Sequence, residues 1–134
     1  MIGRLNHVAI AVRDLGKASA TYRDILGANV SAAVPQPDHG VTTVFITLPN
    51  TKIELLEPLN PDGGVGKFLA RRGGGLHHVC FESDSVDADL EAARAKGLPL
   101  IDQKPRKGLA GMICFLHPKA TRGVLVEYAQ PLED

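Results

Sequence analysis

Two short stretches decide the fold: residues 6–10 read NHVAI and residues 77–81 read HHVCF. In both stretches a histidine precedes a run of residues that favour β-strands. Each run is followed by a residue that can cap a helix, Asp14 after the first stretch and Ser85 after the second. The chain therefore contains the same signals twice, which indicates an internal repeat.

The pattern after each cap extends the repeat. Apolar residues recur at three-and-four spacing until a glycine, Gly27 in the first copy and Gly97 in the second, so each copy is expected to contain a helix. Strand-like runs follow each helix. We expect them at residues 28–34, 41–48 and 52–56 in the first copy, and at residues 98–101, 112–116 and 124–128 in the second. Each copy thus reads strand, helix, strand, strand, strand.

These boundaries predict two βαβββ repeats, residues 4–60 and 76–130. The segment between them, residues 61–75, is rich in glycine and is expected to be a linker with a short helical stretch at residues 65–70. A unit of this size would bury its sheet poorly alone. We therefore expect residues 1–134 to fold as a single domain.

Composition excludes several classes of protein. Hydrophobic residues make up 44% and charged residues 22% of the chain, which excludes a disordered protein. Fifteen basic and fifteen acidic residues give no net charge, so we expect no nucleic-acid partner. The apolar runs are too short to span a membrane, and no secretory signal is expected, so a cytoplasmic location is predicted. Cys80 and Cys114 are expected to be buried thiols.

The candidate metal ligands come from the repeat. The last strand of each copy carries one carboxylate between apolar neighbours, Glu54 and Glu127, at nearly the same distance along the chain from His7 and His78. A carboxylate in such a setting needs a partner, and a cation can supply it. Imidazole and carboxylate ligands suit Zn, Co, Mn, Ni or Fe(II), and no thiolate is expected among them. The four residues therefore predict one metal site.

Strand alternation supports this choice of ligands. His7 shares a face with Ala9 and Ala11, whose small side chains leave space for a ligand, and His78 shares a face with Cys80 and Glu82. Four other residues are not expected to bind the metal. His77 does not align with His7, His39 and His117 lie in loop-like segments where solvent exposure or a substrate contact is expected, and Glu57 is expected at the surface.

The segments LNHVAIAV, KIELLEPL, GGLHHVCFE, FLHPK and GVLVEYAQ closely resemble the methylmalonyl-CoA epimerase family of the vicinal oxygen chelate superfamily. The resemblance implies an α+β fold in which the two βαβββ repeats pair into a curved, partly open eight-stranded sheet around a metal cleft. It also implies an enzyme of propionate metabolism that interconverts (2R)- and (2S)-methylmalonyl-CoA through an enolate, with an acyl-CoA substrate and a homodimeric state.

The same resemblance assigns the site residues. One divalent ion, Co²⁺ first and Mn²⁺, Zn²⁺ or Ni²⁺ as alternatives, would be held by His7, Glu54, His78 and Glu127. Some members of the family carry a glutamate, proposed as a base, where this chain has Thr43. Because a threonine is a poor base, Glu54 and Glu127 become the expected catalytic residues.

Substrate contacts are less sharply indicated. The loop at residues 107–111, KGLAG, could cradle the substrate carboxylate through its backbone amides or could have no such role. Basic side chains that could meet the CoA phosphates are Arg71, Arg72, Arg106 and Lys107.

Three alternatives remain open at this point. A glyoxalase-type isomerase that acts on a glutathione hemithioacetal would use the same ligands. An extradiol dioxygenase is less favoured, because its iron site has a single carboxylate. A metal-free binding module predicts an aromatic-lined cleft, and six Phe and Tyr residues in total count against it.

Overall fold

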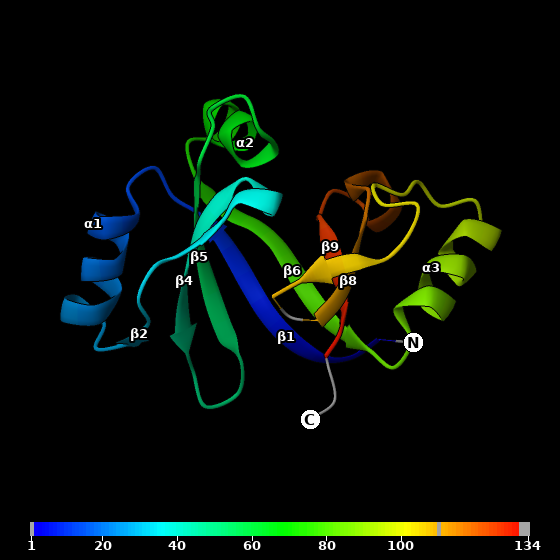
Figure 1. Cartoon of the computed structure of the whole chain (residues 1–134), viewed down its shortest axis with the longest axis horizontal. Helices are drawn as coiled ribbons and strands as arrows, with labels where there is room; N and C mark the ends of the chain where they lie inside the picture. Colours follow the sequence, from blue (N-terminus) through cyan, green and yellow to red (C-terminus); the bar gives the residue numbers. More distant parts are fainter. Residues whose placement is uncertain (1, 110, 132–134) are drawn as a thin grey trace. The chain divides into compact units, whose positions relative to one another are not determined.

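The computed structural model describes residues 2–109 and 111–131 (Figure 1). Its contacts group the chain into two compact units. The first unit comprises residues 7–77, and the second comprises the residues up to Asn6 together with those from His78 onward. Each unit combines helices with a mixed sheet, so the predicted α+β class with two βαβββ repeats is confirmed. The single domain with its predicted boundaries stays a prediction.

The first unit contains the second half of β1 (Ile2–Ala11), α1 (Leu15–Ala20), a π-helical turn (Thr21–Ile25), β2 (Asn29–Val30), β3 (Val34–Gln36), a 3-10 turn (Pro37–His39), β4 (Val41–Thr47), β5 (Lys52–Pro58) and α2 (Gly64–Arg72). Its strands follow the order β2-β4-β5-β1, and β3 also pairs with β4. The pair β1 and β5 is parallel, whereas β4 runs antiparallel to β5.

The second unit contains most of β6 (Gly75–Ser83), α3 (Val86–Ala95), β7 (Arg106–Gly108), β8 (Gly111–Leu116), a 3-10 turn (Pro118–Thr121) and β9 (Val126–Gln130). Its strands follow the order β6-β9-β8-β7. As in the first unit, the first and last strands are parallel neighbours and the third strand is antiparallel to the last. The opening residues of β1 also belong here, where Asn6 Nδ2 donates to Glu82 Oε2 at 3.0 Å.

Two predicted strands differ from the structure. The strand expected at residues 98–101 is wrong, because in that segment the structure has a single bridge between Leu100 and Leu116, and the strand β7 begins at Arg106. The oxygen of Pro99 accepts from the N–H of His117 at 3.1 Å, but Pro99 has no N–H with which to return a bond, so the ladder does not extend beyond the bridge. The run at residues 28–34 is divided between β2 and β3. Ala110, in the predicted loop at residues 107–111, lies outside the described residues.

Each sheet has one face under its helix. In the first unit Leu15 of α1 packs on Val44, Ile46 and Leu55. In the second unit Val86 and Leu90 of α3 pack on Cys114. The bulky apolar face is therefore covered, as the strand alternation predicted, and the opposite face carries the paired histidines and glutamates.

A side chain from the last strand holds the first turn of each helix. The N–H of Leu15 donates to Glu57 Oε2 at 2.6 Å, and the N–H of Val86 donates to Gln130 Oε1 at 2.9 Å. The side chains of Asp14 and Ser85 cap the same helices, as predicted. Glu57 is half-buried. Its carboxylate accepts from a helix N-terminus, where negative charge is stabilised.

Candidate metal centre

The first unit contains a buried histidine–glutamate pair. His7 of β1 is 2% exposed and Glu54 of β5 is 8% exposed. Nε2 of His7 lies 3.0 Å from Oε2 of Glu54. The parallel register places Ala9 beside Glu54, so the histidine and the glutamate project from the same face of neighbouring strands. The small side chains of Ala9 and Ala11 are buried on this face, as the sequence predicted.

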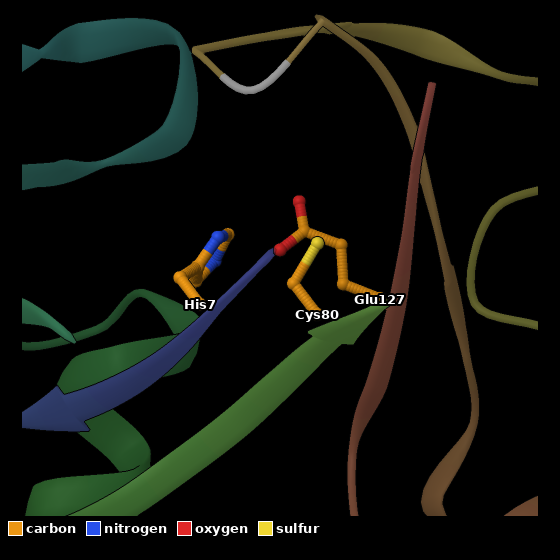
Figure 2. A group of neighbouring side chains, drawn as sticks. All are labelled: His7, Cys80 and Glu127. Carbon is orange, nitrogen blue, oxygen red and sulfur yellow. The ribbon is translucent and has the colours of Figure 1, made fainter. Parts of the chain in front are cut away.

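The second unit repeats this arrangement. His78 of β6 and Glu127 of β9 are buried, and Nε2 of His78 lies 3.1 Å from Oε1 of Glu127. The register places Cys80 beside Glu127, the position that Ala9 has in the first unit. Figure 2 shows the Cys80 and Glu127 side chains extending from these strands. The structure thus brings together each predicted histidine with the predicted glutamate of its own repeat.

The donor atoms of each pair suit a divalent cation. Imidazole nitrogen and carboxylate oxygen are ligands that Zn, Co, Mn and Ni accept. Two ligand atoms bound at about 2.1 Å to one ion, at right angles to each other, lie about 3.0 Å apart. The separations of 3.0 Å and 3.1 Å have this length. Within each unit the pair therefore fits neighbouring ligands of one ion.

Comparison with known proteins identifies the family. Residues 6–115 match the family model of the glyoxalase/bleomycin resistance protein/dioxygenase superfamily. The chain belongs to this superfamily. It is 50% identical over 131 residues to the mitochondrial methylmalonyl-CoA epimerase of Homo sapiens, a match that covers 96% of this chain and 74% of the human protein. It is also 50% identical over 133 residues to the ethylmalonyl-CoA/methylmalonyl-CoA epimerase of Cereibacter sphaeroides, covering 97% of this chain and 99% of that protein.

A solved structure agrees with these relatives. A methylmalonyl-CoA epimerase in complex with methylmalonyl-CoA and NH4+ superposes on this chain with a TM-score of 0.91 and 35% identity, covering 98% of this chain and 96% of the other. Within the superfamily, the chain therefore belongs to the methylmalonyl-CoA epimerases, and the resemblance deduced from the sequence motifs is confirmed.

No helix in the described ranges, 2–109 and 111–131, has the length and apolar character needed to cross a membrane.

The second unit has a cysteine thiol beside its candidate glutamate ligand. Cys80 is fully buried, lies in register with Glu127 and shares the face of His78. Strand alternation in the sequence predicted this face for Cys80, and the expectation that no thiolate is among the metal ligands stays a prediction. Cys114 is also buried, but it lies on the helix-covered face. Burial, helped by the negative charge of Asp102, raises the pKa of the Cys114 thiol to about 12.

Each glutamate also has a phenylalanine beside it. Phe45 lies in register with Glu54 and Phe115 lies in register with Glu127. The ring of Phe115 meets the His78 imidazole edge to face, with 5.2 Å between the ring centroids and 87° between the planes. Sequence reasoning missed both aromatic residues, although their matched positions on the third strands of the two repeats could have indicated them.

Thr43 is fully buried on β4. Its Oγ1 accepts a hydrogen bond of 2.7 Å from Nε2 of Gln36 on β3. A neutral hydroxyl in this position cannot act as a carboxylate base.

The remaining sequence candidates have other surroundings. His77 packs edge to face on Phe68 of α2, with 5.0 Å between centroids. Nδ1 of His117 accepts from the N–H of Lys119 at 3.1 Å and so caps the following 3-10 turn. His39 is half-buried at the end of a 3-10 turn. Of the basic residues considered for CoA, Arg71, Arg72 and Lys107 are exposed, whereas Nε of Arg106 lies 3.1 Å from Oδ1 of Asp102.

Proposed function

We propose that this protein interconverts (2R)- and (2S)-methylmalonyl-CoA. The observation that carries the proposal is the duplicated pair of a buried histidine and a buried glutamate, separated by 3.0 Å in one unit and 3.1 Å in the other. The relatives that are 50% identical carry epimerase names, one of them for both ethylmalonyl-CoA and methylmalonyl-CoA. Their names support an acyl-CoA substrate with a carboxylate on its α-carbon.

The reaction defines what the site must do. The proton to be removed lies on the carbon between a thioester carbonyl and a carboxylate. Its removal leaves negative charge on the thioester oxygen as an enolate, and this charge must be stabilised in a site that excludes water. Return of the proton to the opposite face completes the inversion, so the reaction needs two acid–base groups.

We infer that His7, Glu54, His78 and Glu127 together hold one divalent ion per chain. Support comes from the nitrogen and oxygen donors, from their burial and from the separation of the donors within each pair. Co²⁺ is the first candidate, with Mn²⁺, Zn²⁺ and Ni²⁺ as alternatives. When bound, such an ion supplies Lewis-acid stabilisation of the enolate oxygen and the substrate carboxylate.

We assign the proton transfers to Glu54 and Glu127. Both are buried carboxylates, one from each repeat, so the one that is ionised can remove the proton while the other, when protonated, returns a proton to the opposite face. Thr43 leaves the usual alternative position without a carboxylate. The equivalence of the two repeats supports a role for each glutamate on one of the two faces of the substrate, as an inversion requires.

The partners follow from the substrate. Exposed Arg71, Arg72 and Lys107 are candidates for the CoA phosphates, and the described residues of the 107–111 loop remain a candidate cradle for the substrate carboxylate. The homodimer, the cytoplasmic location and the role in propionate metabolism stay predictions of the family resemblance.

The decisive test is isotope exchange at C2. The Co²⁺-loaded protein is incubated with (2R)-methylmalonyl-CoA in D2O, and both deuterium at C2 and the 2S product are followed by mass spectrometry and a stereospecific coupled assay. We expect exchange together with epimerisation, and the same with ethylmalonyl-CoA at a different rate. A protein that leaves the C2 proton in place but isomerises the hemithioacetal of glutathione and methylglyoxal would instead be a glyoxalase-type isomerase.

A further inference from the structure

Phe115 is the aromatic residue in contact with a candidate ligand of the second unit. It lies on β8 in register with Glu127, and its ring meets the His78 imidazole at 5.2 Å and 87°. Edge-to-face packing at this distance is a preferred arrangement of two flat rings. The ring also packs against Cys80, Ile113 and Ala129, a cluster of buried residues on the same face of the sheet. Phe115 is therefore enclosed by the sheet beneath it and by the histidine beside it.

A further pair of residues holds Phe115. The guanidinium carbon of Arg106 on β7 lies 5.7 Å from the centroid of the Phe115 ring. Asp102 binds both partners: Oδ1 lies 3.1 Å from Nε of Arg106, and Oδ2 accepts the N–H of Phe115 at 2.7 Å. A planar guanidinium that is held by a carboxylate stacks on an aromatic ring in a defined place. The contacts thus run from Asp102 through Arg106 and Phe115 to His78.

The first unit has a different arrangement at the same register positions. Phe45 lies beside Glu54, as Phe115 lies beside Glu127. The residue opposite Thr43 on β3 is Val34, whereas the residue opposite Ile113 on β7 is Arg106. Since Thr43 and Ile113 both lie two residues before the phenylalanine, Val34 is the counterpart of Arg106. A valine side chain has no charged planar group that could stack on an aromatic ring. The contact of a guanidinium with the phenylalanine is therefore specific to the second unit.

We propose that Phe115, braced by Arg106 and Asp102, is a positioning residue that keeps the His78 imidazole turned with Nε2 toward Glu127. The terminal torsion of a histidine side chain has a broad energy minimum, so the strand alone does not fix the plane of the imidazole ring. An edge-to-face neighbour at a fixed angle restricts the plane of the ring and so keeps Nε2 directed at Glu127. The proposal deepens the proposed function, because it concerns the ligand set of that site, and its first readouts require no turnover.

The main test compares Phe115→Leu with a matched control. Phe81→Leu removes an aromatic side chain from β6 itself, on the face opposite His78. Binding of Co²⁺ alone is measured by calorimetry and by its d–d absorption. We expect Phe115→Leu to weaken binding about tenfold, the lower range for loss of a partner that orients a metal ligand. Phe81→Leu should bind as the parent does, and the conservative variant Phe115→Tyr should restore most of the affinity.

The orientation itself is read in the metal-free protein. Long-range ¹H–¹⁵N NMR spectra of the imidazoles should show one sharp set of His78 signals in the parent and in Phe81→Leu, and broadened or additional His78 signals in Phe115→Leu, because the ring is less restricted there. Arg106→Leu, which leaves the core intact, should weaken Co²⁺ binding about two- to fivefold, the range of an exposed cation–π contact. This variant decides the matter if Phe115→Leu does not fold.

Three results would overturn the proposal: unchanged Co²⁺ affinity in both Phe115→Leu and Arg106→Leu, an equal loss in Phe81→Leu, or weaker binding with a single unaltered set of His78 signals. Failure of the proposed function has a different signature, namely absence of C2 exchange by the parent protein with its metal bound.

Discussion

In the first unit Glu54 lies in register between Ala9 and Phe45, and in the second unit Glu127 lies between Cys80 and Phe115. Both units have a glutamate, its histidine and a phenylalanine at these matched positions. The residue in register on the first strand differs, since it is an alanine in the first unit and a cysteine in the second. The helix anchors also correspond, since Glu57 and Gln130 accept the first N–H of α1 and α3. The comparison shows that the repeat retains the ligands and the contacts that hold the strands, while their neighbours differ.

Further differences between the two units lie beside the third strand of each repeat. The first unit has a hydrogen bond between Gln36 and Thr43, and the second has the stack of Arg106 on Phe115. Two equivalent pairs therefore have unequal surroundings. The two faces of a chiral substrate are also not the same. A site that inverts one carbon through these faces can therefore have two unlike sides.

The equivalence of the two pairs predicts the largest effects. His7→Ala and His78→Ala should each weaken Co²⁺ binding by on the order of 10²-fold or more, since loss of a ligand exceeds loss of an outer partner. The parent should bind one ion per chain, measured by calorimetry and metal analysis. His117→Ala is the matched control and should bind normally. Two ions per chain would show that each unit holds its own metal.

The two glutamates should be separable from metal binding. Glu54→Gln and Glu127→Gln each keep an oxygen that can bind the ion but lose the base, so epimerisation should fall by on the order of 10²-fold or more. Metal content should persist, and one variant should still exchange the C2 proton of a single epimer. The exposed Glu91→Gln is the control. Wild-type turnover in both variants would assign proton transfer to another group.

The helix anchors provide a comparison of stability. Glu57→Ala and Gln130→Ala each leave a helix N–H without its side-chain partner, so each should lower the free energy of unfolding by about 1 kcal/mol. Loss of Glu57 should cost more, because a charged acceptor at a helix N-terminus also interacts with the helix dipole. Both losses of stability are measured by urea denaturation, in which the slope of the unfolding free energy against urea concentration should stay unchanged. Equal stability of the parent and both variants would contradict the anchoring role.

Cys80→Ala gives the second unit the same three residues in register as the first unit, namely alanine, glutamate and phenylalanine. If nitrogen and oxygen ligands suffice, Co²⁺ affinity and turnover should stay within about threefold of the parent, and the variant should lose affinity for the thiophilic ion Cd²⁺. Absorption spectra of the Co²⁺ protein give the direct readout. A sulfur-to-cobalt charge-transfer band that disappears in Cys80→Ala would instead make the thiol a ligand.

The smallest effect on turnover is expected at Thr43. Thr43→Ala removes the acceptor of the Gln36 hydrogen bond, which should lower the free energy of unfolding by about 1 kcal/mol. Turnover should change by less than about twofold, because a neutral hydroxyl is not the base. A large loss of turnover without a loss of stability would place Thr43 in the reaction.

The sequence by itself determined the repeat, the helix boundaries and the four candidate ligands. These features depend on local physics: Asp14 and Ser85 cap the next turn of chain, and Gly27 and Gly97 adopt the positive φ of 69° and 73° that follows each helix. Alternation along a strand likewise identified the face that carries His7. Matched positions in two repeats then separated His78 from His77, which no property of a single histidine could do.

Only the tertiary structure decided which residues meet across strands. The register that places Glu127 between Cys80 and Phe115, and the bond from Val86 to Gln130, join segments far apart in the chain. Local propensity does not encode such pairings, which depend on the register of neighbouring strands and on the turns that connect them. For the same reason the strand expected at residues 98–101 is reduced to one bridge, and the strand β7 begins only at Arg106, the residue that reaches Phe115.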